Sequence, residues 1–141
     1  MDEELRLVAR LTNGPAAVEQ SRVAVVNYLE PLGIFGRTMN RVEVVLEELV
    51  SNLVRHSKDV KLVTVAAGYR AGVVELVVED DGDPFDPLAA PDPNPFTTLP
   101  EAQLGGLGIH LVRQLTNSAN YDRVGSGAEA RNRVSVRIKN G

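Results

Sequence analysis

Two β-rich segments separated by one short turn restrict the fold of this chain more than any other feature of its sequence. Val60 to Tyr69 and Val73 to Glu79 are rich in strand-forming residues, and only Arg70-Ala71-Gly72 separates them. Strands joined by so short a turn run antiparallel, because a parallel pair needs a long crossover connection. The sequence therefore predicts a β-hairpin.

Two helices are predicted before this hairpin. Residues 15 to 31 carry apolar side chains at helical spacing, Pro15 suits the first turn, and Pro31 and Gly33 close the segment. The apolar positions of this first helix are Val18, Val23, Val26, Leu29 and Leu32. Residues 38 to 56 form the second helix, and the 4-3-4 spacing of its apolar positions predicts a core-facing stripe. These positions are Val42, Leu46, Leu49 and Leu53.

The remaining elements complete the order β-α-α-β-β-α-β-β. Leu5 to Leu11 is a plausible first strand, residues 107 to 117 resume a helical pattern, and two closing strands are expected at Ser118 to Val124 and Arg133 to Lys139. Helices segregated from hairpin-linked strands indicate an α+β fold. We expect a two-layer α/β sandwich with a mixed, mostly antiparallel sheet and helices on one face.

Composition narrows the class of protein. The 141 residues suit a single domain, and a net charge of −4 argues against direct binding of nucleic acid. The absence of cysteine excludes disulfides and thiolate zinc sites. The acidic start lacks a secretory pattern, and no apolar run is long enough to span a membrane. The expected location is the cytoplasm.

The second predicted helix carries three polar residues at intervals of four. Glu48, Asn52 and His56 project from one face, beside the apolar stripe and not opposite it. Such a position is half buried and suits a site at the edge of a core. A carboxylate there can orient or deprotonate a nucleophile, and an amide oxygen can bind Mg²⁺. The same spacing also fits an ordinary polar helix edge.

Clustered carboxylates follow the second strand of the hairpin. The strand runs directly into Asp80-Asp81-Gly82-Asp83. An aspartate in an Asp-x-Gly sequence can accept a hydrogen bond from an exocyclic amine such as that of adenine, and the glycine lets a flat ring approach the backbone. Asp-Gly is also a common turn sequence, which is the simpler interpretation. A calcium loop is conceivable, but the spacing does not match the EF-hand pattern.

Glycines open the third predicted helix, at Gly105-Gly106-Leu107-Gly108. Backbone N–H groups at a helix N-terminus form an anion site, and glycines let phosphate oxygens come close. The pattern completes neither a P-loop nor a dinucleotide fingerprint. A role in packing or as a hinge explains the glycines equally well.

The order and spacing of these motifs resemble those of the Bergerat-fold (GHKL) ATPases. Within that superfamily the chain is most similar to the anti-sigma-factor serine/threonine kinase branch, through EELVSNLVRHS, EDDGDPFDPLAAP, GGLGIHLVRQL and RNRVSVRIK. The motifs that carry the resemblance are Glu48-x-x-x-Asn52-x-x-x-His56, Asp80-x-Gly82 and Gly106-x-Gly108. The resemblance covers nearly the whole chain and implies one histidine-kinase-like ATPase domain over residues 1–141.

The resemblance implies a role for each residue on the second helix. Asn52 would coordinate Mg²⁺ and so help to bind ATP. Glu48 would activate the attacking hydroxyl of a protein serine or threonine. His56 would support the site without taking part in the chemistry.

The resemblance also implies how the nucleotide would be held. Asp80 would bond the adenine amino group, and Gly82 would make room for the ring. Gly106 and Gly108 would bring their backbone amides to the phosphates. Asn132 stands near a position where the family often has a threonine that helps to hold adenine. The segment from Asp80 to Gly108 contains six of the eight prolines. The resemblance implies that it includes an ATP lid at about residues 86–104.

Two functions are compatible with this resemblance. The first is phosphorylation, from ATP with Mg²⁺, of an anti-anti-sigma (STAS-domain) protein, together with sequestration of a sigma factor. The second is a protein-interaction module that binds ATP without transferring phosphate, because no lysine or arginine occurs between Arg70 and Arg113. Such a cation commonly stabilises the transferred phosphoryl group. A homodimer is a possible assembly, since dimers occur in this branch.

Two other classes have less support. A two-component histidine kinase would need a dimerisation helix pair and a phosphoacceptor helix, neither of which the pattern indicates. A metal hydrolase would need a cluster of ligands, and the only two histidines, His56 and His110, lie in contexts that do not form one.

Overall fold

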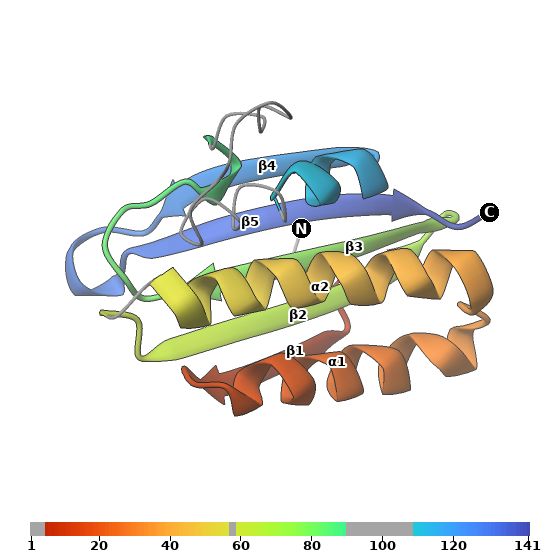
Figure 1. Cartoon of the computed structure of the whole chain (residues 1–141), viewed down its shortest axis with the longest axis horizontal. Helices are drawn as coiled ribbons and strands as arrows, with labels where there is room; N and C mark the ends of the chain where they lie inside the picture. The colour runs from red at the N-terminus through yellow and green to blue at the C-terminus, as the bar shows by residue number, and fades with distance from the viewer. Residues whose placement is uncertain (1–4, 57–58, 90–108) are drawn as a thin grey trace, which may run out of the picture.

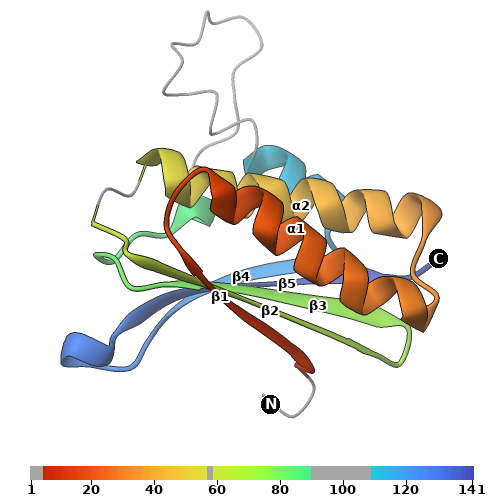
Figure 2. The same ribbon diagram turned by 90° about the horizontal axis from the view of Figure 1, so that it is seen from below.

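A computed structural model describes residues 5–56, 59–89 and 109–141 of the chain. Five strands form one sheet, and the helices lie together on one of its faces (Figures 1 and 2). The strands are β1 (Leu7–Thr12), β2 (Leu62–Arg70), β3 (Val73–Asp80), β4 (Ser118–Val124) and β5 (Arg131–Lys139). The helices are α1 (Ala16–Leu29) and α2 (Gly36–His56), with short 3₁₀ turns η2 (Glu30–Leu32), η3 (Pro87–Ala89) and η4 (Gly127–Glu129). Residues 109–115 are also helical.

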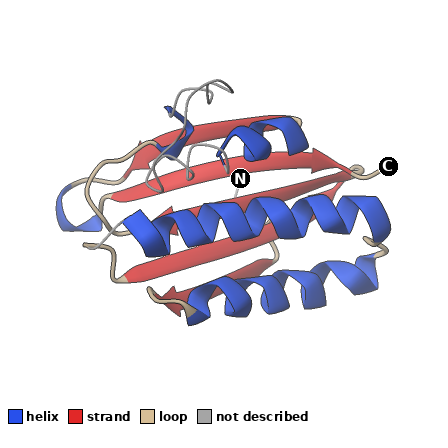
Figure 3. Cartoon of the chain, in the orientation of Figure 1, coloured by secondary structure: helices blue, strands red, loops and turns tan. Residues whose placement is uncertain are grey.

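The strand order in the sheet is β1-β2-β3-β5-β4, and all four pairings are antiparallel. The predicted two-layer α+β sandwich is therefore confirmed, with no parallel pair among the described strands (Figure 3). β5 returns to the centre of the sheet and lies beside β3, although about fifty residues separate them in sequence. This pairing decides which side chains meet at the end of β3.

The hairpin forms at the predicted turn. Ala71 and Gly72 both have positive φ angles, of 54° and 76°, and Arg70 pairs with Val73 across the turn. Two consecutive residues with positive φ characterise the two-residue turn whose twist matches that of the flanking strands. The turn fixes the register of β2 and β3, so that the end of β3 lies beside the start of β2.

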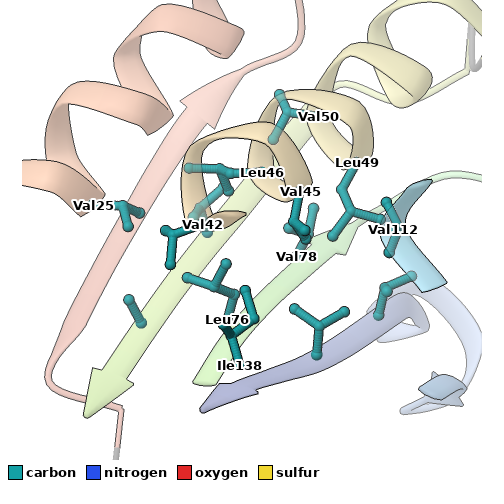
Figure 4. Packing of buried hydrophobic residues seen from close by; sticks show 14 of the residues in the cluster. Val25, Val42, Val45, Leu46, Leu49, Val50, Leu76, Val78, Val112 and Ile138 are labelled. Carbon is teal, nitrogen blue, oxygen red and sulfur yellow. The ribbon is translucent and has the colours of Figure 1, made fainter. Parts of the chain in front are cut away.

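Helix α2 supplies most of the helical side of the core. Its predicted apolar positions Val42, Leu46, Leu49 and Leu53 are between 0% and 6% exposed. Figure 4 shows Leu49 pointing toward Val78 of β3 and toward Val112 of the helix at 109–115. The apolar stripe therefore anchors α2 along the centre of the sheet, and the residues that flank the stripe lie at its edge.

The predicted apolar stripe of the first helix was correct for Leu29, which is buried, and for Val18 and Val26, which pack partly buried against the core, but wrong for two positions. Val23 and Leu32 are 41% and 46% exposed. The line that faces the core consists of Ala17, Ser21, Val25 and Leu29. Small side chains at two of these positions let the helix lie close to its neighbours, and the buried Ser21 hydroxyl donates to the Val18 carbonyl at 2.8 Å. Valine occurs on several sides of this helix, so periodicity alone could not identify the buried line.

In the part of the chain that the structure describes, no helix combines the length and apolar character needed to cross a bilayer.

Candidate functional site

The first predicted site residue, Asp80, ends strand β3 on the face covered by helices. Asp80 is 5% exposed. Its Oδ1 atom accepts hydrogen bonds from the backbone N–H of Gly82 at 2.9 Å and from Nδ2 of Asn132 at 2.9 Å. No other described residue donates a hydrogen bond to this carboxylate, so its second oxygen is available to a ligand.

Asn132 lies directly opposite Asp80 in the pairing of β3 with β5 and is 3% exposed. Besides Asp80, its Nδ2 donates to the carbonyl of Asp83 at 2.8 Å. Its Oδ1 accepts from the Tyr121 hydroxyl at 2.5 Å and from the N–H of Phe85 at 3.2 Å. The Asn132 amide therefore joins the Asp80 carboxylate to the backbone of the following turn.

A cavity of about 10 Å³ lies beside Asp80, between α2 and the sheet. It is lined by Leu49 and Leu53 of α2, Val78 and Val134 of the sheet, Pro87 of η3, and the two polar residues Asp80 and Asn132. A cavity of this size holds about one water molecule. A flat aromatic ring therefore enters only when one of these walls moves.

Glu48 and Asn52 each precede one of the two leucines that line this cavity. Asn52 is 7% exposed, and its side-chain amide makes no hydrogen bond to any residue that the structure describes. Glu48 is half buried, and within the described ranges its carboxylate forms neither a hydrogen bond nor an ion pair. Mg²⁺ prefers oxygen donors, and the amide oxygen of Asn52 is one, so Asn52 is a candidate ligand for this ion.

Several predicted site residues cannot be placed. Gly106 and Gly108 lie outside the described residues, as do residues 90–104 of the expected lid. His56 is the last residue of α2, but its side chain is not described. At the start of the expected lid, Pro87 and Leu88 are buried, and Leu88 belongs to the hydrophobic core.

Burial raises the pKa of Asp80 above its ordinary value of 3.8. The hydrogen bonds from Asn132 and Gly82 favour the ionised form and oppose this effect, while the nearby Asp81 and Asp59 carboxylates add to it. A buried carboxylate with a raised pKa beside an apolar cavity is typical of a functional site.

Sequence reasoning missed two residues that organise the site, Tyr121 and Arg123, both on β4. Nη1 of Arg123 donates to the carbonyl of Gly82 at 2.8 Å, and Tyr121 bonds Asn132 as described above. Neither belongs to a motif that could be recognised. Their role depends on the pairing of β4 with β5, which places Arg123 opposite Asn132.

A larger hollow lies on the opposite, uncovered face of the sheet. Its volume is about 540 Å³, and its lining includes Val8, Arg10, Ala66, Arg133 and also Asp80. The predicted residues Glu48 and Asn52 lie on the helical side, so the small cavity beside Asp80 remains the candidate site.

Replacing Gly82 by alanine is expected to destabilise the protein and disturb the site together. An added Cβ would lie 2.6 Å from Cγ2 of the buried Val60 and 3.1 Å from Oδ1 of Asp80. Relieving such overpacking typically costs about 1–3 kcal/mol. Urea denaturation measures this loss, with Gly14→Ala as the control, because a Cβ at Gly14 meets nothing within 4 Å. Equal stabilities of the two variants would contradict the tight packing inferred for Gly82.

The site is thus a carboxylate at the floor of a small apolar cavity, between a helix and an antiparallel sheet, with the largely buried amide of Asn52 on the helix. This arrangement defines a ligand-binding α+β sandwich. Residues 11–138 match the family model of the histidine kinase-like ATPase domain, and the chain belongs to that family. Membership supports ATP as the ligand.

The fold agrees with that of a solved structure. The catalytic domain of the histidine kinase ThkA, in a nucleotide-free form, is 13% identical with a TM-score of 0.51, and the match covers 94% of this chain and 95% of that one. The Acinetobacter baumannii histidine kinase AdeS is 18% identical with a TM-score of 0.46, covering 98% and 70% of the two chains. No protein with a curated description matches the chain.

Proposed function

We propose that this domain binds ATP with Mg²⁺ in the cavity beside Asp80 and phosphorylates a serine or threonine of an anti-anti-sigma (STAS-domain) protein. The observation that carries the nucleotide part is the Asp80 carboxylate, with one oxygen held by Gly82 and Asn132 and the other available. A carboxylate can accept but not donate, so it suits the exocyclic amine of adenine.

The residues present fit a Mg²⁺ ion. The amide of Asn52, which bonds no described residue, would provide an oxygen ligand, and phosphate oxygens of ATP and water would provide the others, as is usual for this ion. When bound, Mg²⁺ neutralises charge on the phosphates. Asn52 holds the ion and Glu48, one turn earlier on the same helix face, is placed to accept the proton of the attacking hydroxyl.

The finer parts of the proposal rest on the resemblance of the motifs to the anti-sigma-factor kinase branch. They are the STAS-domain substrate, the sequestration of a sigma factor and the cytoplasmic location. A cation is also needed at the transferred phosphoryl group. Arg55, exposed on α2 one turn beyond Asn52, makes no ion pair within the described ranges and is a candidate for this role.

A second candidate function is an ATP-binding interaction module that does not transfer phosphate. The absence of lysine and arginine between Arg70 and Arg113 favours it. Phosphate transfer from bound ATP to a STAS-domain protein would exclude this candidate, whereas ATP binding without transfer would support it.

Calorimetric titration with ATP, in the presence and absence of Mg²⁺, tests the proposal. We expect saturable binding that Mg²⁺ strengthens. Asn52→Ala should remove most of this strengthening, because the variant loses the proposed oxygen ligand. It should retain the fold, because the described structure gives the amide no partner to lose.

Ser51→Ala is the matched control for this titration. Ser51 neighbours Asn52 on α2, and its hydroxyl makes only a local bond, at 3.5 Å, to the carbonyl of Glu48. The control should bind ATP and respond to Mg²⁺ as the wild type does. A Mg²⁺ effect that survives in Asn52→Ala would remove Asn52 from the metal site. No binding by the wild type would refute the proposed function.

A further inference from the structure

We infer that Tyr121 and Asn132 form a positioning pair that aims the Asp80 carboxylate at the nucleobase and thereby sets the preference for a base with an exocyclic amine. The inference rests on the proposed function, because it concerns the same site. It assigns Asn132 a role through Asp80 and not through direct contact with the base, and it adds Tyr121, which no motif indicates.

The hydrogen bonds of Asn132 leave it little to offer a ligand. Its Nδ2 has two donor positions, and these are directed to Asp80 Oδ1 and to the carbonyl of Asp83. Its Oδ1 accepts from Tyr121 and from Phe85. An amide has two donors and about two acceptor positions, so all of them are used by the protein.

The Tyr121 hydroxyl holds the Asn132 amide in the orientation that its other partners require. Because the Phe85 N–H can only donate and the Asp83 carbonyl can only accept, the oxygen of the amide lies toward Phe85 and the Tyr121 hydroxyl, and its nitrogen lies toward Asp80. A flipped amide would set two oxygens against each other at Asp80. Tyr121 therefore acts on the carboxylate through Asn132.

The pair fixes the rotation of the carboxylate. Oδ1 of Asp80 is held by Asn132 from strand β5 and by Gly82 from the following turn. With that oxygen fixed, only Oδ2 can accept from a ligand in the adjoining cavity. An amine at the edge of a bound base gains from this acceptor, whereas a carbonyl oxygen at the same place meets it with repulsion.

The same pair links the base site to the turn at 83–85. Asn132 bonds the Asp83 carbonyl and the Phe85 N–H, and Pro87, two residues later, lines the cavity. Removing the Tyr121 hydroxyl should therefore change both the orientation of the Asp80 carboxylate and the position of one wall of the cavity.

The test compares ATP with inosine triphosphate, which carries a carbonyl in place of the exocyclic amine, in the wild type and in Tyr121→Phe. We expect the wild type to prefer ATP, and the variant to lose affinity for ATP by roughly 3- to 10-fold, the usual effect of one hydrogen bond. The affinity for inosine triphosphate should change less, so the ratio of the two affinities should be smaller in Tyr121→Phe than in the wild type. A variant that had only lost structure would instead bind ATP and inosine triphosphate more weakly by the same factor.

Tyr69→Phe is the matched control. Tyr69 lies on β2, and its hydroxyl bonds Asn140 at 3.1 Å, at the other end of the sheet. Removing this hydroxyl should leave the preference between the two nucleotides unchanged. A preference in Tyr121→Phe equal to that of the wild type would overturn the inference.

A second measurement does not depend on nucleotide. The pKa of Asp80, followed by the NMR chemical shift of its carboxyl carbon, should rise in Tyr121→Phe and further in Asn132→Asp. Tyr121→Phe weakens the donor that favours the ionised form, whereas Asn132→Asp removes this donor and places a second carboxylate beside Asp80. The other charged groups near this carboxylate are Asp81, Asp59 and the Arg123 guanidinium, and they are the same in all these proteins.

The nucleotide affinities and the pKa of Asp80 together distinguish a failure of the inference from a failure of the proposed function. If the wild type binds no ATP, the proposed function fails, and the titration of Asp80 alone decides whether Tyr121 and Asn132 position it. An unchanged pKa in Tyr121→Phe would then overturn the inference, and a raised pKa in this variant would support it.

Discussion

Asp80→Asn is expected to lower affinity for ATP by roughly 10- to 100-fold, since a hydrogen bond to a charged group contributes about 1.5–3 kcal/mol. The two donors at Oδ1, from Gly82 and Asn132, would keep the oxygen of the new amide in place. Its nitrogen would then replace Oδ2 and present a donor to the donor amine of adenine. Calorimetric titration with ATP measures the loss.

The same substitution should not weaken the fold. Burial raises the pKa of Asp80, so the folded state holds the proton more tightly than the unfolded state does. The free energy of unfolding therefore falls as pH rises from 3.8 through the raised pKa. Asp80→Asn has no such charge, so it should match the wild type at low pH and equal or exceed its stability at neutral pH. Urea denaturation across this pH range checks the sign.

Asp83→Asn is the control for both measurements. Asp83 lies in the same turn, but its side chain is exposed. The control should keep both ATP affinity and the pH dependence of stability. Wild-type affinity in Asp80→Asn would mean that the base lies elsewhere, even if ATP binds.

The sequence predicted those features that depend on local periodicity. The apolar stripe of α2 has a 4-3-4 spacing and is buried as expected, so the positions of Glu48 and Asn52 beside that stripe followed. The hairpin followed as well, because its two strands are separated only by a short turn. In each case the residues that interact lie within a few turns or one strand length of each other.

The sequence did not predict features that depend on long-range register. Asp80 and Asn132 are 52 residues apart and meet only because β5 pairs with β3. Asn132 was selected through a family resemblance, which did not indicate its bonds to Tyr121 and to the turn. The α1 stripe was wrong at Val23 and Leu32 for a different reason. Valines on several sides of the helix offered more than one apolar line, and the small residues Ala17 and Ser21 gave no hydrophobic signal.

Glu48→Gln is expected to lower the rate of phosphate transfer to a STAS-domain protein by about 10²- to 10⁴-fold, the usual contribution of a general base. The glutamine keeps the size of the side chain but cannot take a proton from the attacking hydroxyl. Among the described residues the Glu48 carboxylate has no partner to lose, so affinity for ATP and stability should change little. Single-turnover transfer of labelled phosphate measures the rate.

Glu47→Gln is the control, because Glu47 is the neighbouring carboxylate on α2 but is exposed on another side of the helix. It should transfer phosphate at the wild-type rate. If both variants are equally active, Glu48 is not the base.

If the wild type binds ATP but transfers none to STAS-domain proteins, the Glu48 carboxylate has no substrate to act on. The chain between Arg70 and Arg113, which lacks lysine and arginine, then accounts for the result: ATP is held, but the charge that develops during transfer is not stabilised.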